Sequence, residues 1–163
     1  MSVSMYQISV PPLLRGLGVL SALLRKGEAH ADATSMLEAR LAPDMMTLVG
    51  QVQRASDTAK GCAARLAGLD APAMPDTEAS FADLQSRISR TVDFLQSIKR
   101  EQIDGSEAKP ISFKAGQSML NFTGESYVLT FVLPNFYFHV TAAYAILRHK
   151  GVPLSKLDYL GPR

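Results

Sequence analysis

The chain has 163 residues, of which 47% are hydrophobic and 20% charged, and its net charge is +2. This length suits one domain, so we expect a single domain over residues 1–163 that buries roughly two-thirds of its unfolded surface. The basic residues are scattered, whereas nucleic-acid binding needs a clustered basic face, so we expect no nucleic-acid partner. The single cysteine, Cys62, excludes an intramolecular disulfide and a cysteine-based zinc cluster, and we expect it to be a small buried helix residue.

The N-terminal residues, MSVSMYQISVPPLLRG, have no basic segment before their apolar residues, unlike a secretory signal peptide. The longest apolar stretch, residues 127–147, is interrupted by polar residues and by Pro134, so it falls short of the roughly 18 uninterrupted apolar residues of a membrane span. We therefore expect a cytoplasmic protein without a membrane partner.

The first expected helix is marked by apolar residues at helical spacing, which are Val10, Leu13, Leu14, Leu17 and Leu24. Either Ser9 or Ser4 serves as its N-cap. Pro11 and Pro12 either start the helix or kink it, and the pattern ends near Gly27.

A second helix is predicted to start at Pro43 and Asp44, because proline suits a first turn and a carboxylate favours the helix dipole. Its apolar stripe runs from Met45 to Leu66, and Gly68 ends it. The third helix is capped by Asp76 or Thr77 in this prediction. Its core face runs from Phe81 to Ile98, and it ends between residues 99 and 102.

The segment PISFKAGQSMLNFTG breaks the helical pattern and predicts a short β-hairpin with a glycine-containing turn. The last helix follows with Thr123 as its cap, and Pro134 predicts a kink or a break within it. Lys150 and Gly151 close this helix. A tail follows, with the apolar anchors Leu154, Leu157, Tyr159 and Leu160.

These elements predict an all-α fold, a four-helix bundle with a short β-hairpin inserted before the last helix. The segment 135–149 is apolar on two neighbouring faces, so two sides of this helix need to be covered. The bundle covers one side, and either the hairpin with the first helix or a second subunit covers the other. An exposed apolar patch of that size is unusual on a monomer, so we expect a homodimer.

Four stretches, ARLAPDM, QVQRASDTAKG, NFYFHVTAAYAILRHKGV and KLDYLG, resemble a bacterial family of unknown function in the DinB/YfiT-like four-helix-bundle superfamily. The resemblance covers essentially the whole chain and implies a DinB-like fold. Metal-binding members carry one histidine on the second helix and His-x-x-x-His on the last helix, followed nine residues later by arginine and then by glycine. His139, Arg148 and Gly151 match the second histidine of that pair, the arginine and the glycine.

The metal ligands of the superfamily are incomplete in this sequence. Asn135 stands where the first histidine of the pair is expected, and the second helix offers Gln51, Gln53 and Asp57 in place of its histidine. Because zinc prefers imidazole and thiolate ligands, we expect no metal and no other cofactor. If a divalent metal such as zinc or nickel does bind, its expected ligands are His139, Asp57 and Asn135.

Two interpretations of His139 stay open. It is a half-buried core residue that is hydrogen-bonded to Asn135 or to the second helix, or it shares a polar pocket with Asn135 and acts as an acid or a base. Asp57 and Gln53 either lie on a solvated face, with Arg54 or Lys60 as the partner of Asp57, or face a cleft. The candidate residues of a small-molecule pocket are His139, Asn135, Asp57, Gln53 and Tyr144.

The sequence thus favours a DinB-like small-molecule-binding or scaffold bundle with a degenerate metal site. The alternative is a metal- or thiol-dependent hydrolase or transferase, because the superfamily that it resembles includes such enzymes. The residues alone leave open whether the chain is an enzyme.

Overall fold

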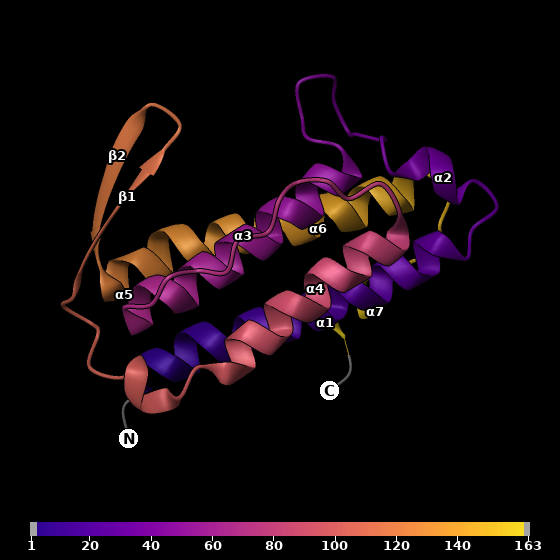
Figure 1. The fold of residues 1–163 in the computed structure, drawn as a ribbon. Coiled ribbons are helices and arrows are strands. Elements are labelled where there is room, and N and C mark those ends of the chain that lie inside the picture. Colours follow the sequence, from indigo (N-terminus) through magenta and orange to yellow (C-terminus); the bar gives the residue numbers. More distant parts are fainter. Residues whose placement is uncertain (1–2, 162–163) are drawn as a thin grey trace.

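The structure, a computed structural model, describes residues 3–161. Four long helices form an elongated helical body (Figure 1): α1 (Met5–Glu28), α3 (Leu48–Ala67), α4 (Phe81–Ser97) and α6 (Leu133–His149). The shorter elements are α2 (Ala33–Met36), the 3-10 turn η1 (Arg100–Gln102), the strands β1 (Pro110–Ala115) and β2 (Ser118–Thr123), α5 (Gly124–Ser126), the π-helical segment η2 (Tyr127–Val132) and α7 (Lys156–Leu160). The prediction of a mostly helical chain with one antiparallel hairpin is confirmed.

The core lies where the apolar faces of the four long helices meet. α3 packs against α6 and α4, and α1 packs against all three other long helices. Fully buried side chains come from each of them, for example Leu17 and Leu24 of α1, Leu84 of α4 and Phe136 of α6. Cys62 on α3 is also fully buried, as the sequence predicts.

α1 begins at Ser4, whose hydroxyl accepts a hydrogen bond from the Gln7 amide in a reciprocal capping box. The other candidate cap, Ser9, lies inside the helix and donates its hydroxyl to the Met5 carbonyl at 2.7 Å. The helix continues through Pro11 and Pro12, so these prolines do not start it. Tertiary packing of the helix outweighs the two backbone hydrogen bonds that the prolines remove.

The predicted start of the second helix at Pro43 and Asp44 is wrong. α3 begins at Leu48, with the Thr47 hydroxyl accepting a hydrogen bond from the Gly50 amide. Pro43 lies instead in a loop that hydrogen bonds back to the segment before it, as in the Leu48 amide to the Ala39 carbonyl at 2.9 Å. Backbone hydrogen bonds across this loop therefore hold it outside the helix. The predicted end is confirmed, because Gly68 adopts the left-handed conformation with φ of 72°.

The predicted caps of the third helix, Asp76 and Thr77, are also wrong. α4 begins at Phe81, and its cap is Ser80, whose hydroxyl accepts a hydrogen bond from the Asp83 amide. Asp76 is used elsewhere, in ion pairs with Arg54 and Arg87. Residues 68–80, which we call the linker, run along α3 before α4 begins (Figure 1).

The hairpin of β1 and β2 projects from one end of the helical body (Figure 1), with Ala115 paired with Ser118 next to the turn. Gly116 supplies the positive φ of 59° that this tight turn requires. The inner face of the hairpin carries Phe113 and Phe122, which contact the rings of Tyr127 and Phe131. These contacts fix the hairpin to the helix that follows it.

The last helical region runs from Gly124 to His149 without a break. Thr123 caps it as predicted, accepting a hydrogen bond from the Ser126 amide. Pro134 causes neither a break nor a new start. The π-helical segment η2 precedes it, and the Leu133 amide donates to the Val128 carbonyl, five residues back. The wider turns absorb the missing proline donor.

The tail differs in part from the prediction. Leu154 is buried as an apolar anchor, but Leu157 and Leu160 on α7 are exposed. α7 lies against α1, where Lys26 pairs with Asp158 at 2.6 Å and Tyr159 packs against the core.

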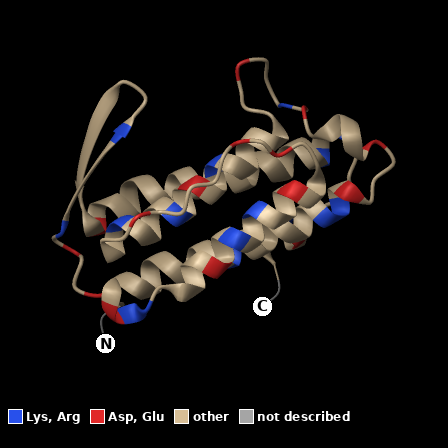
Figure 2. Ribbon diagram, viewed as in Figure 1, with Lys and Arg blue, Asp and Glu red and all other residues tan. Residues whose placement is uncertain are grey.

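Two helical regions, Met5–Glu28 and Gly124–His149, are long and apolar enough to cross a membrane by length and composition alone. Both pack into the helical body, and a core helix of a soluble protein passes the same test. Charged residues are spread over the helices and loops on the side that Figure 2 shows, without a large patch of one sign.

Candidate functional site

The seam between α3 and α6 holds two of the three residues at which the sequence places the degenerate metal site, His139 and Asn135. On α3, Gln51 and Thr58 are seven residues apart and so share one face. On α6, Asn135 and His139 are four residues apart and share another. His139 Nδ1 lies 2.8 Å from Gln51 Oε1, and Asn135 Nδ2 donates to Thr58 Oγ1 at 2.8 Å.

The hydrogen bonds of Gln51 fix the orientation of the His139 ring. Gln51 Nε2 donates to the Met46 carbonyl at 3.3 Å, so Oε1 is the atom that faces the histidine. An amide oxygen only accepts, so Nδ1 of His139 carries the proton in this network, and its Nε2 keeps a lone pair. Within residues 3–161, that Nε2 has no hydrogen-bond partner.

Burial lowers the pKa of His139 below 6.5, and the nearby positive charge of Arg54 lowers it further. The imidazole is therefore neutral at pH 7. A neutral ring with one free nitrogen can accept a hydrogen bond or act as a base.

The donor set of this seam does not fit zinc or a similar metal. It contains one imidazole, while the Oε1 of Gln51 already faces the Nδ1 of that imidazole. The charge of Arg54, which disfavours the imidazolium, disfavours a divalent cation for the same reason. In the described part of the chain, no three His, Cys, Asp or Glu side chains form a group able to hold a metal.

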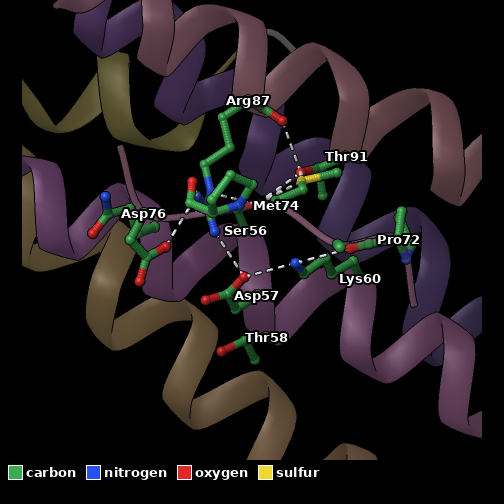
Figure 3. A network of polar contacts seen from close by, with 12 residues as sticks. Ser56, Asp57, Thr58, Lys60, Pro72, Met74, Asp76, Arg87 and Thr91 are labelled. Carbon is green, nitrogen blue, oxygen red and sulfur yellow. Dashed lines mark hydrogen bonds and ion pairs between the residues drawn. The ribbon is translucent and has the colours of Figure 1, made fainter. Parts of the chain in front are cut away.

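Asp57 belongs to a different network, which is centred on Arg87 of α4 (Figure 3). The Arg87 side chain is only 2% exposed, and its NH2 group donates to Asp57 at 2.8 Å. Its NH1 group lies 2.9 Å from Glu78 and 3.1 Å from Asp76. Its Nε donates to Ser56 Oγ at 3.2 Å. Every donor group of this buried cation is thus satisfied.

This network attaches the linker to α3 and α4. Arg87 also donates to the carbonyl of Pro75, and Lys60 donates to the carbonyl of Pro72 at 3.1 Å. Gln53 donates to Glu78 at 2.8 Å. These contacts explain why the linker follows the α3–α4 surface.

The contacts of Asp57 and Gln53 combine both of the alternatives that the sequence left open. Asp57 pairs with Arg54 and Lys60 as on a solvated face, and also with the buried Arg87. Gln53 is buried, but it faces the linker. The sequence reasoning missed Arg87, although its position three residues after Leu84 on the core face of α4 was a signal.

Tyr144 lies away from the His139 seam. Its ring contacts that of Tyr159 with 5.9 Å between centroids, next to α7. The structure therefore brings Asn135 and His139 together against α3, and directs Tyr144 to the other side of α6. The hydrogen-bond partner of His139 is Gln51 of α3, and not the alternative Asn135.

An open groove with a volume of about 660 Å³ lies between α1 and α7. Its apolar walls are formed by Leu14, Val19, Ala22 and Leu157, and its polar lining includes Arg15 and Asp158. Gly18 forms part of the floor, where an added Cβ atom would have nothing within 4 Å. The pKa of Asp158 is lowered to about 2, mainly by its hydrogen bond from Lys26, so this carboxylate is charged at neutral pH.

Comparison with known proteins agrees with this architecture. A crystal structure of a DinB family member protein from Shewanella denitrificans matches with a TM-score of 0.86 and 36% sequence identity, over 97% of this chain and 92% of that chain. No curated protein matches the chain. The resemblance to a DinB-like family of unknown function is thereby confirmed. A family model matches residues 5–160, and the chain belongs to the family that it describes, the Domain of unknown function (DUF1993).

Proposed function

We propose that this protein is a DinB-type four-helix bundle that binds a small organic molecule and whose metal site is degenerate. The observation that carries the proposal is the groove between α1 and α7. Its volume of about 660 Å³ is within the range of known small-molecule sites. The donor set at the α3–α6 seam supports the second part of the proposal, because it lacks the ligands that a metal needs.

The lining of the groove suggests an amphipathic ligand. Leu157 is 70% exposed on one wall, so a bound apolar group would remove its side chain from water. Lys26 and Asp158 form an ion pair at the same wall, and Arg15 adds a cation to the lining. A molecule with a short apolar chain and a polar or acidic head matches both parts of this surface.

The experiment measures the binding of decanoate and of the dye 1-anilinonaphthalene-8-sulfonate to the folded protein by calorimetry and fluorescence. A Gly18→Trp variant fills the groove. An added Cβ atom at this position would have nothing within 4 Å, so the new side chain can be attached without a clash at its base. Ala82→Trp, at an exposed position of α4 outside the groove, is the matched control.

We expect both probes to bind the wild type and the Ala82→Trp variant, and to bind the Gly18→Trp variant at least about tenfold more weakly. Equal binding by both tryptophan variants, or no binding of either probe by the wild type, would reject the groove as the site.

The alternative function, a metal- or thiol-dependent hydrolase or transferase, is favoured by one observation. His139 keeps a neutral ring, and its Nε2, at the position of a superfamily metal ligand, has no partner among the described residues. Elemental analysis after exposure to zinc, nickel and manganese tests this alternative, with His139→Ala as the variant and exposed His149→Ala as the control. About one equivalent of metal, lost only in His139→Ala, would favour the enzyme. A metal-free wild type would favour the binding bundle.

A further inference from the structure

The outer side of the last helical region is uncharged and incompletely covered. From Ser126 to Leu147 the sequence contains no Asp, Glu, Lys or Arg. A helix face in contact with water normally carries such residues. Here, however, the exposed residues are Pro134, Phe138 and Thr141, and Phe138 is 55% exposed. An exposed helix face without charged residues is typical of a surface that contacts another molecule.

An apolar hollow lies directly beside Phe138. Its volume is about 390 Å³, and it is lined by Leu41, Met45, Tyr137, Phe138, Thr141, Ala142 and Ala145. Of the lining residues, Leu41 belongs to the loop before α3 and is 42% exposed. We call this surface the α6 face; it consists of Leu41, Met45, Pro134, Phe138, Thr141 and Ala145. The projecting ring of Phe138 and the hollow beside it are complementary in shape.

Opposite charges lie beyond the two ends of the α6 face, along the same helical region. Glu125 lies in the first turn of the helical region and Arg148 in the last turn of α6. Neither residue has an ion-pair partner within residues 3–161. Arg148 lies seven residues after Thr141, and so on nearly the same side of the helix.

We propose that the α6 face binds the α6 face of a second copy of this chain, with the two helices antiparallel about a twofold axis. Twofold symmetry brings the same patch of each subunit together, so Phe138 of each copy enters the hollow of the other. The antiparallel arrangement directs Glu125 of one copy toward Arg148 of the other, whereas a parallel arrangement would bring like charges together.

The α6 face is long enough for contact between two helices. Residues 134–145 extend about 16 Å along the helix axis, and the loop that carries Leu41 widens the surface. A standard interface buries about 800 Å² on each partner. Its centre is apolar and its charges lie at the rim, which is the usual arrangement in homodimers.

Sedimentation equilibrium of the full chain over about 1 to 100 μM tests the proposal, because dimerisation depends on protomer concentration. We expect a dimer for the wild type and a monomer for Phe138→Asp. The control is Met119→Asp, which places the same charged residue at a 62% exposed hydrophobic position on the hairpin. This variant should remain a dimer. Circular dichroism and thermal melting confirm that each variant is folded.

A charge exchange tests the orientation. Glu125→Arg and Arg148→Glu should each weaken the dimer several-fold, and the double variant should regain wild-type affinity. A wild type that is monomeric throughout, or a dimer that Phe138→Asp leaves intact, would overturn the proposed interface. A double variant that is weaker than either single variant would overturn the antiparallel arrangement.

Discussion

Gly16 and Gly18 on α1 differ in what surrounds them. A Cβ atom on Gly16 would lie 2.3 Å from the Phe136 ring, which is too close for any real contact. A Cβ atom on Gly18 would meet nothing within 4 Å. Gly16 is therefore required for the close approach of α1 and α6, whereas Gly18 is an ordinary helix position that opens into the groove.

The same substitution at these two positions should have opposite effects. We expect Gly16→Ala to lower the free energy of unfolding by about 1–3 kcal/mol, because the core around Phe136 is already filled. We expect Gly18→Ala to raise it by about 0.5–1 kcal/mol, because alanine restricts the unfolded chain more than glycine does. Urea unfolding measures both values, and equal changes at the two positions would contradict this interpretation.

His139 should make stability depend on pH. Its pKa is lowered in the folded protein, mainly by burial, and is near 6.5 in the unfolded chain. Between these two values the unfolded state binds more protons, so the stabilising contribution is complete above pH 6.5 and is lost as the pH falls through the lowered pKa.

His139→Gln should remove this pH dependence while an amide remains opposite Gln51. Urea unfolding at about pH 7.5 and about pH 5.5 should show a larger loss of stability in the wild type than in the variant. An equal loss in both proteins would show that His139 does not titrate in this way.

At the scale of the elements, Arg87 is the residue on which the linker depends. Its guanidinium is buried and satisfies carboxylates from α3 and from the linker at once. A buried cation of this kind is costly to break, because its partners are then left unpaired. This network also accounts for the late start of α4, since Asp76 binds Arg87 and does not cap a helix.

Arg87→Met should lower the free energy of unfolding by about 3 kcal/mol or more, although methionine fills much of the same space. Arg90→Met is the matched control. Arg90 is exposed, and within residues 3–161 it donates only to the Ala73 carbonyl at 3.3 Å, so its change should stay within about 0.5 kcal/mol. Chemical denaturation of the two variants gives the comparison, and similar losses would mean that the Arg87 network contributes no special stability.

The π-helical segment shows how one element depends on its neighbours. Pro134 alone predicts a kink or a break, but the chain stays helical because the turns before it widen. The same segment contains Tyr127 and Phe131, which contact the aromatic residues of the hairpin. Arg65 of α3 lies over the Phe113 ring at 4.2 Å and donates to the Tyr127 hydroxyl at 2.8 Å.

At the scale of the whole molecule, Cys62 reports on global unfolding. It is fully buried on α3, and burial raises the pKa of its thiol to about 12. The thiolate is the reactive form, so the folded protein should react with Ellman's reagent only when the helical body opens.

We expect labelling of Cys62 at pH 8 to be slower than labelling of the unfolded chain by at least about a thousandfold, which is the lower range of folding equilibrium constants. Ser89→Cys, at an exposed position of α4, should add a second thiol that reacts at once. If Cys62 reacted as fast as the thiol at position 89, the core would open locally near α3.

The sequence by itself determined the features that depend on neighbouring residues or on the side chain's own chemistry. Helical periodicity identified the four long helices, and the KAGQS segment identified the hairpin turn. Thr123 and Gly68 marked helix ends because their effects act within one turn. The burial of Cys62 followed from its residue type and its place in an apolar stripe.

Only the tertiary structure decided what depends on contacts between distant segments. It selected Gln51 as the partner of His139, because the rotation of α3 against α6 is set by packing along both helices. It directed Asp57 to Arg87, which lies thirty residues away in the chain. The groove beside Gly18 likewise exists only because α7 returns to α1. Local patterns contain no information about such pairings, since the free energy that selects them comes from burial and long-range hydrogen bonds.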